Sequence, residues 1–345
     1  MFNWQGRYLV RGMPKDFNLF GDVEMNKWNR EIKKFLTHHK MVWGVLVAIC
    51  LGASGCAPAS QQGSSASASP QPTVTQVSPA SPTLTIAPTT EPTVPVLQGR
   101  STTDRTDDLS GYQVHVIYVV TSDGVDRNYD TNGFLDISVA SFEKWMSLQT
   151  GGRQFRMDTY QGALDISFFR MAETDAQVAS HASFVREQIQ AELNAAGFNQ
   201  PKKLYAVYYD GTSTFSCGGS AWPPTITGDV TALYLKGAYG SVHCADNAFT
   251  SSVNSPGILE FSMLQEIFQT LGAAALCAPH EIPNGKVSDS NADILYGGSL
   301  PWRPSKIDVG NDDYFDTKSP NCLDIAKSVF IDPLPANAVP PPGWR

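Results

Sequence analysis

The chain is short of basic residues, and none of them form a stripe. Lys and Arg number 25, against 33 Asp and Glu. Residues 57–345 alone carry 17 basic and 29 acidic side chains, a net charge of −12. Proteins that bind nucleic acid need clustered Lys and Arg to neutralise phosphates. We therefore expect no nucleic-acid partner.

Long hydrophobic runs are also missing. The longest apolar stretch, "MVWGVLVAICLGA" at 41–53, is too short to span a bilayer comfortably. It follows Lys33, Lys34 and Lys40 and is followed by the small-residue run "ASGC", which ends at Cys56. A basic flank, a short apolar core and small residues are typical of a signal peptide. A buried core helix is the alternative interpretation.

The run that ends at Cys56 resembles the lipobox of bacterial lipoproteins, and residues 41–56 would then be signal peptide and lipobox. The resemblance implies that Cys56 is acylated and becomes the mature N-terminus. The protein would be lipid-anchored to the bacterial cell membrane or envelope, on the extracytoplasmic side. Residues 1–40 are long and mixed in charge for a leader, so we interpret them as an N-terminal extension and expect translation to start at Met25 or Met41.

Charge is almost absent from the next segment. Residues 57–100 contain only Glu91 and Arg100 as charged side chains and few large apolar ones. Such a composition cannot bury enough surface to offset chain entropy. Alternating Pro, Ser and Thr favour an extended tether of up to ~130 Å. We predict a disordered linker over 57–107 and a short irregular Pro-rich tail over 333–345.

The remaining residues, 108–332, are enough for one domain with a sizeable core. Their hydrophobic patterns alternate between the period of strands and that of helices. This order predicts an α/β (α+β) domain, with helices packed on a twisted mixed sheet. The expected strands are 112–120, a pair around Gln161 and Gly162, 203–211 and 229–237, and the expected helices are 134–150, 175–196 (capped by Thr174) and 258–275.

Cysteine is scarce, with six in the chain. Cys50 would leave with the signal peptide and Cys56 would carry lipid, which leaves an even number in an oxidising compartment. Of three connectivities we favour the one in which each bridge closes a short loop. A four-cysteine zinc site is the alternative, but the CxxC pairs of such sites are missing. The favoured bridges are Cys217–Cys244 and Cys277–Cys322.

The most informative absence lies in the last helix. In "QEIFQTLG", Gln265, Glu266, Gln269 and Gly272 occupy the frame HExxHxxG. In that frame two histidines four residues apart share one helix face and bind one metal, while the glutamate polarises its water. Here both histidines are replaced by glutamine.

The wider stretch "EFSMLQEIFQTLGAAALCAPHEIPNGKVSDSNADILYGG" (260–298) resembles a group of secreted bacterial metzincin-like zinc metallopeptidase domains. Those domains have a helix HExxHxLGA, then CAP, GHVSD and DLMY. Weaker similarities occur at 217–224 and 300–315. The resemblance implies a metzincin-like twisted sheet with a degenerate active-site helix at about 258–275.

The departures from this pattern fall on the metal ligands. Gln265 and Gln269 replace the helix histidines, and Lys286 replaces the histidine of GHVSD; the alternative metzincin frame would use Ala275. Neither alignment leaves a zinc ligand, so we expect that zinc is lost and that there is no cofactor. A substitute site from the two glutamines and His280 would be weak, because zinc prefers imidazole, thiolate or carboxylate.

Glu266 then has two interpretations, a catalytic base or a vestigial residue in a structural ion pair with Lys286, and we favour the second. In "DSNAD" (289–293) the acidic spacing is that of a calcium loop, but the glycine and the distal glutamate of an EF-hand are missing, which favours a turn.

Three functions remain open at this level. The first is a membrane-anchored, catalytically inactive metallopeptidase-like domain that binds a peptide or envelope component. The second is an active hydrolase with a non-standard metal site or with none. The third is a structural envelope lipoprotein without a ligand.

Overall fold

The computed structural model of the chain describes residues 98–223, 225–239 and 242–344. The predicted signal peptide, the lipidation site Cys56 and most of the predicted linker lie outside the described residues.

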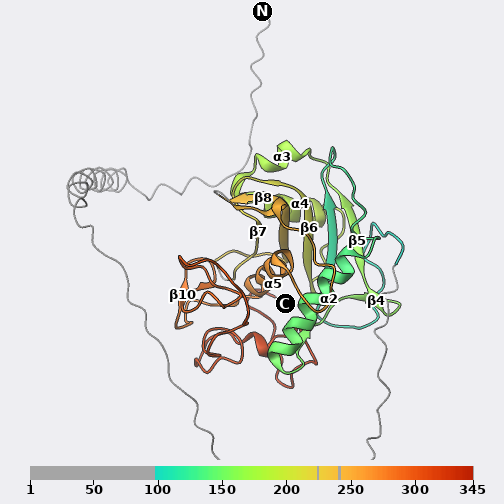
Figure 1. The fold of residues 1–345 in the computed structure, drawn as a ribbon. Helices are drawn as coiled ribbons and strands as arrows, with labels where there is room; N and C mark the ends of the chain where they lie inside the picture. The colour runs from blue at the N-terminus through green and yellow to red at the C-terminus, as the bar shows by residue number, and fades with distance from the viewer. Residues whose placement is uncertain (1–97, 224, 240–241, 345) are drawn as a thin grey trace, which may run out of the picture. The chain divides into compact units, whose positions relative to one another are not determined.

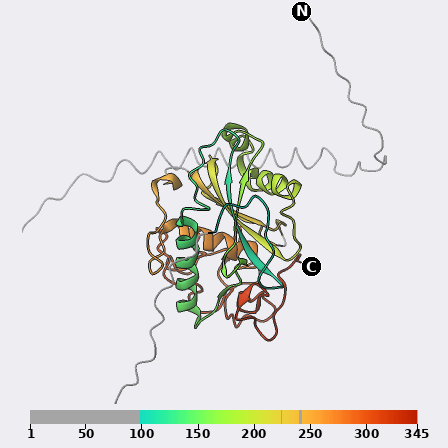
Figure 2. The same cartoon turned by 90° about the vertical axis from the view of Figure 1, so that its right-hand side faces the viewer.

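One twisted sheet forms the centre of the domain (Figures 1 and 2). Five of its six strands follow the order β5-β1-β6-β8-β7, and β9 pairs with the far part of β8. The pairs among β5, β1, β6 and β8 are parallel, whereas β7 and β9 run antiparallel to β8. The strands are β1 (Gln113–Val120), β5 (Ile166–Arg170), β6 (Lys203–Ser213), β7 (Gly218–Gly219), β8 (Val230–Tyr239) and β9 (Val242–His243).

The central strands are buried on both faces, as is typical of parallel strands that helices cover on both sides. All eight residues of β1 are buried. Val116 and Tyr118 belong to one hydrophobic core, and Ile117 and Val119 belong to the other. The alternation of side chains along the strand therefore divides the core into two halves.

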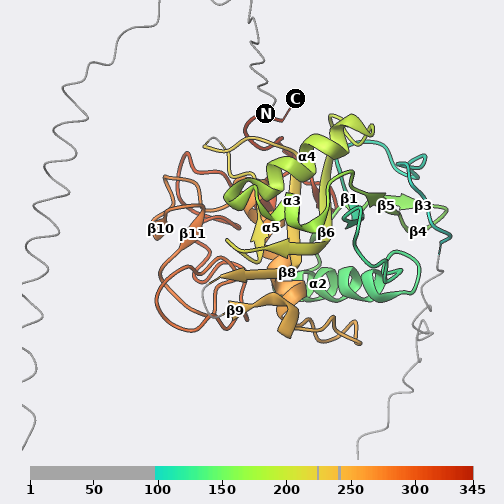
Figure 3. The same ribbon diagram turned by 90° about the horizontal axis from the view of Figure 1, so that it is seen from above.

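Helices cover both faces of the sheet, so the domain has three layers (Figure 3). One pair of helices packs on the face that carries Val116 and Tyr118, and a second pair packs on the opposite face, which carries Ile117 and Val119. This arrangement confirms the predicted α/β class. The first pair is α2 (Phe134–Thr150) and α5 (Ile258–Thr270), and the second is α3 (Asp175–Ala179) and α4 (Val185–Ala195).

The prediction of one continuous helix over 175–196 is wrong, because the structure has two separate helices there, α3 and α4. Thr174 caps the start with a capping box, as expected, but α3 ends after one turn. Ala182 has a positive φ of 54° and the short 3-10 turn η1 (Ala182–Phe184) follows before α4 begins. The break redirects the chain, so that α3 packs on β6 and α4 packs on β8.

The predicted helix 258–275 is also too long, since α5 ends at Thr270. Gly272 adopts a left-handed φ of 88°, and the Ala273 N–H donates to the Phe268 carbonyl at 3.0 Å. This is a Schellman ending, which glycine favours because it lacks Cβ. The chain after Gly272 is therefore free to turn back along the helix.

The C-terminal segment, residues 273–344, contains little regular structure and lies beside α5 (Figure 1).

The small antiparallel strand pairs of the domain include the predicted hairpin, in which Gln161 and Gly162 form the turn between β3 and β4. The strand after β4 does not extend this hairpin, because β5 pairs with β1 instead. The remaining short elements are β2 (Gln154–Phe155), β3 (Thr159–Tyr160), β4 (Ala163–Leu164), β10 (Glu281–Ile282), β11 (Lys286–Val287), β12 (Ile331–Asp332), η2 (Cys244–Asp246) and η3 (Ile325–Lys327).

Segments on both sides of 108–332 also pack on the domain. Arg100 bonds to Asp126 and Asp130, and its guanidinium lies 4.0 Å from the ring centre of Phe168. At the other end, the rings of Trp344 and Phe330 lie 4.9 Å apart in an edge-to-face contact. The packed chain thus extends beyond the predicted boundaries in both directions.

Candidate functional site

Helix α5 turns two glutamine amides toward the C-terminal segment. Gln265 is 8% exposed, and its Nε2 donates to the Ile294 carbonyl at 3.0 Å. Gln269 is 3% exposed, and its Nε2 donates to the carbonyls of Asn284 at 2.7 Å and Gly285 at 3.3 Å. The two positions where the motif places metal ligands therefore hold backbone carbonyls in place by hydrogen bonds.

Gln269 also connects the helix to the edge of the sheet. Its Oε1 accepts from the Ser220 hydroxyl at 3.3 Å, and Ser220 follows β7 directly. Both ends of this amide are therefore occupied, and the helix, the β7 edge and the C-terminal segment meet at one buried side chain. A neutral histidine has one N–H donor and one acceptor, so it could not supply the two donated bonds and one accepted bond that Gln269 makes.

Glu266, between the two glutamines, is only partly buried and lies against β7. A Cβ added to Gly218 would collide with the carboxylate, so glycine at that strand position leaves room for it. Removal from water raises the pKa of Glu266 to about 7, although the positive charge of Lys286 and the Ser220 hydroxyl act in the opposite direction. Near neutral pH this carboxyl group exists in both protonation states.

Lys286 begins β11 and faces Glu266 from the C-terminal segment. Its stem lies over Gly297, where a Cβ would collide with it. Burial lowers the pKa of Lys286, and the charge of Glu266 opposes that effect. In the described chain, however, the ammonium makes no ion pair or hydrogen bond with any side chain. The predicted structural ion pair is therefore wrong: each charge affects the pKa of the other group, but the Lys286 nitrogen and the Glu266 oxygens do not come within ion-pair distance.

The four remaining cysteines form the two bridges that the sequence favours. The Cα atoms of Cys217 and Cys244 are 5.8 Å apart, and those of Cys277 and Cys322 are 5.6 Å apart. The first bridge holds the residue before β7, and the second holds the segment after α5. Disulfides indicate an oxidising, extracytoplasmic compartment.

Across the described ranges, no helix is both long and apolar enough to cross a membrane.

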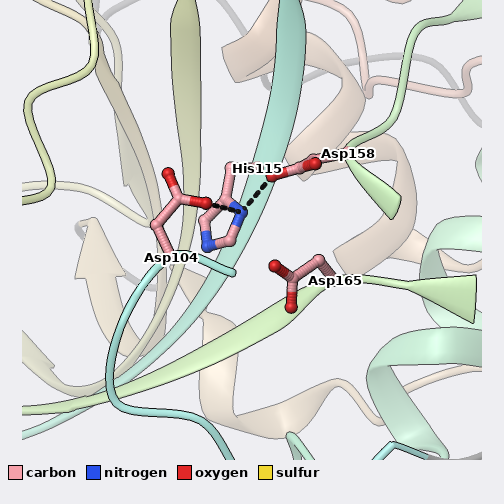
Figure 4. Close-up of side chains that lie close together, drawn as sticks. All are labelled: Asp104, His115, Asp158 and Asp165. Carbon is pink, nitrogen blue, oxygen red and sulfur yellow. Dashed lines mark hydrogen bonds and ion pairs between the residues drawn. The ribbon is translucent and has the colours of Figure 1, made fainter. Parts of the chain in front are cut away.

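A second charged cluster, which the sequence did not reveal, lies where β1 and β6 begin (Figure 4). His115 is fully buried, and its Nδ1 lies 2.7 Å from Asp158 Oδ2 and 3.8 Å from Asp104 Oδ1. Lys203 donates to Asp104 at 2.6 Å, to Asp107 at 2.7 Å and to Asp158 at 2.5 Å. Nearby, Arg105 pairs with Asp165 at 2.8 Å.

Ligand atoms of Asp104, His115, Asp158 and Asp165 lie within 4.8 Å of one another, a spacing that could suit a metal ion. The Lys203 ammonium, however, already donates to the Asp104 and Asp158 carboxylates of this group, and Arg105 pairs with Asp165. The cluster is therefore a structural ion network that ties residues 104–107 to the sheet. No sequence motif predicts it, because the parallel pairing of β1 and β6 brings together residues that are far apart in the chain.

His280 is not directed to the α5 glutamines by any hydrogen bond in the described structure. Its Nδ1 lies 3.1 Å from Asp313 Oδ2 and 3.9 Å from Asp312 Oδ2. The hydrogen bond to Asp313 raises the pKa of His280. Two side chains of "DSNAD" have different hydrogen-bond partners and share no ligand position. Asn291 donates to the Pro301 carbonyl. The buried Asp293 accepts from the Leu295 and Val309 N–H groups and from the Tyr314 hydroxyl.

No protein-family model matches the chain, and no curated protein matches it either. The most distinctive chemistry of the described residues lies at the α5 site, which we define as Gln265, Glu266, Gln269, Ser220 and Lys286. It offers two engaged amides, a carboxyl group with a pKa near neutrality and a cation without an ion-pair partner among the described residues.

Proposed function

We propose that the chain is a membrane-anchored, extracytoplasmic lipoprotein whose metallopeptidase-like domain binds peptides without hydrolysing them. The observation that carries the proposal is the use of Gln265 and Gln269. A metal ligand needs a free lone pair directed at the ion. Both side chains instead direct their amide N–H groups at backbone carbonyls of the C-terminal segment.

The sheet edge beside this site supports a peptide as the ligand. Strand β7 is the last in the order β5-β1-β6-β8-β7, so its outer edge carries no further strand among the described residues. An extended peptide can add to such an edge through main-chain hydrogen bonds. Glu266 lies against Gly218 of this strand, so a peptide bound there would pass the Glu266 side chain, on which the charge of Lys286 acts.

The test combines metal analysis with peptide binding. The purified full-length chain should retain no stoichiometric zinc after dialysis against a mild chelator, should bind peptides from a random library, and should leave them intact. About one zinc per chain, or turnover of bound peptides, would overturn the proposal. Binding of no peptide at all would favour the structural envelope lipoprotein.

The metallopeptidase resemblance has its own test. The combined variant Gln265→His, Gln269→His and Lys286→His would place three imidazoles at the positions of the motif, the number of protein ligands that a catalytic zinc site uses. We expect this triple variant to bind zinc, while each single variant does not. Failure of a folded triple variant to bind zinc would contradict the resemblance.

The anchor is part of the proposal and rests on the sequence before residue 57. A Cys56→Ser variant should lose incorporation of labelled palmitate and should leave the membrane fraction. Unchanged labelling would exclude Cys56 as the lipidation site.

The properties of Glu266 support one alternative function, a hydrolase that does not use a zinc ion bound at positions 265, 269 and 286. A carboxyl group with a pKa of about 7 is suited to general acid–base catalysis at neutral pH, and the Ser220 hydroxyl lies beside it. If this alternative holds, wild type cleaves peptides or esters and Glu266→Gln loses that cleavage while still binding the substrate.

A further inference from the structure

The α5 site contains a cation that the protein itself does not neutralise. Lys286 approaches from β11, and within the described residues its ammonium has no ion-pair or hydrogen-bond partner. Its stem is held over Gly297, with Ile282 on the same side, so the side chain cannot simply move out to water without losing this packing. A positive charge is therefore held near Glu266, whose carboxylate lies against Gly218 of β7.

The facing carboxyl group neutralises this charge only in part. Glu266 is the nearest acid, but burial raises its pKa to about 7, so below that pH most molecules carry a neutral Glu266. The other groups that face Glu266 add no negative charge near neutrality: Ser220 is a hydroxyl, and burial raises the pKa of Tyr234, which stays protonated. An unpaired, partly buried cation loses hydration that a ligand anion can replace.

We propose that Lys286 anchors a carboxylate of the bound peptide, so that the site prefers peptides with a free C-terminal carboxylate or an acidic side chain near the bound end. This inference rests on the proposed peptide-binding function and specifies its ligand class. The β7 edge supplies main-chain contacts that any sequence can make, and Lys286 supplies the selection.

The experiment uses two random hexapeptide libraries of the same composition, one with a free C-terminal carboxylate and one amidated. A third library has a free carboxylate but lacks Asp and Glu, which separates terminal from side-chain carboxylates. Binding to the full-length chain is measured at about pH 6, where Glu266 is mostly neutral. If the terminal carboxylate is the anchor, amidation should weaken binding by about tenfold or more. If a side-chain carboxylate is the anchor, removal of Asp and Glu should weaken binding by a similar factor, because either change removes a hydrogen bond to a charged group.

Three variants assign the effect to Lys286. Lys286→Met keeps the stem and removes the charge, so it should bind the free and amidated libraries equally. Lys286→Arg keeps a cation and should restore part of the preference. Lys202→Met removes an exposed lysine outside the α5 site and should leave the preference unchanged. Thermal unfolding of each variant confirms that it is folded.

The dependence on pH gives a second readout. At about pH 8 Glu266 is ionised and competes for Lys286, so the preference for free carboxylates should weaken in wild type. It should persist in Glu266→Gln. Equal binding of all three libraries by wild type, or a carboxylate preference that survives in Lys286→Met, would overturn the inference while leaving peptide binding intact. Binding of none of the three libraries would overturn the proposed function and the inference together.

Discussion

Lys203 and Lys286 are both first residues of a strand, one buried and one partly buried, but their ammonium groups have opposite surroundings. The ammonium of Lys203, 4% exposed, donates to three carboxylates. Burial alone would lower the pKa of Lys203, but the hydrogen bonds to Asp104, Asp107 and Asp158 outweigh burial and raise it. The pKa of Lys286 is lowered, because only Glu266 opposes burial.

The difference separates a structural charge from an available one. A buried ion is stable when its neighbours replace the hydration that it has lost. At Lys203 the protein supplies that replacement completely, and the network fastens residues 104–107 to the sheet. At Lys286 the replacement is incomplete, which is what a ligand site requires.

Lys203→Met should produce the largest effect. The change leaves Asp158, which is fully buried, and its neighbours Asp104 and Asp107 without their shared cation. Breaking a buried ion network from one side costs about 3–5 kcal/mol. We expect a loss of that size in the free energy of unfolding, measured by urea denaturation. Lys202→Met should change it by less than about 0.5 kcal/mol. If the Lys203 variant were equally mild, the network would not be structural.

The second prediction concerns the pH dependence of stability at Glu266. The folded pKa of about 7 lies above the ordinary 4.5, so the folded state holds the proton more tightly than the unfolded state. Stability should therefore fall as pH rises from about 4.5 to 7, by at most about 3 kcal/mol from this group. Denaturation curves across this range should be flatter for Glu266→Gln than for wild type. Parallel curves would show that Glu266 titrates normally.

Gln269→Ala should have an intermediate effect. The variant leaves the carbonyls of Asn284 and Gly285 and the hydroxyl of Ser220 without their partner. Lost hydrogen bonds at a buried site cost about 1–3 kcal/mol. Gln149→Ala, an exposed position on α2, is the matched control and should be neutral or slightly stabilising because alanine favours helices. Equal stability of the two variants would mean that the Gln269 hydrogen bonds contribute nothing to folding.

Much of the scaffold could be predicted from the sequence because local patterns determine it. The helix 134–150 has the predicted bounds, and the runs that became β1, β6 and β8 are apolar enough to be buried on both faces. The break after α3 was missed because it depends on the backbone of Ala182, a residue type that ordinarily favours helix. The end of α5 was missed by a few residues, although Gly272 carried the signal.

The candidate site was only partly predictable for a related reason. The spacing of Gln265, Glu266 and Gln269 follows from helix geometry, but the acceptors of the two amides lie 15 to 29 residues further along an irregular segment. Their positions depend on tertiary packing. The network around Lys203 was missed entirely, because Asp104 and Lys203 lie 99 residues apart and Asp104 belongs to an irregular segment before β1 that only tertiary packing brings to Lys203.

Lys286→Met should have the smallest effect on stability, and its sign should depend on pH. Methionine keeps a stem that can pack over Gly297 and removes an ammonium that has no contact partner among the described residues. At about pH 6, where Glu266 is mostly neutral, the loss of a poorly solvated charge should leave the free energy of unfolding within about 1 kcal/mol of wild type, on the stabilising side. At about pH 8 Glu266 is ionised and the variant lacks the Lys286 charge that favours this ionised form, so the variant should become slightly less stable than wild type. Urea denaturation at the two pH values measures both differences. A loss of several kcal/mol at about pH 6 would place Lys286 in the same class as Lys203, and the contrast between a structural and an available lysine would then fail.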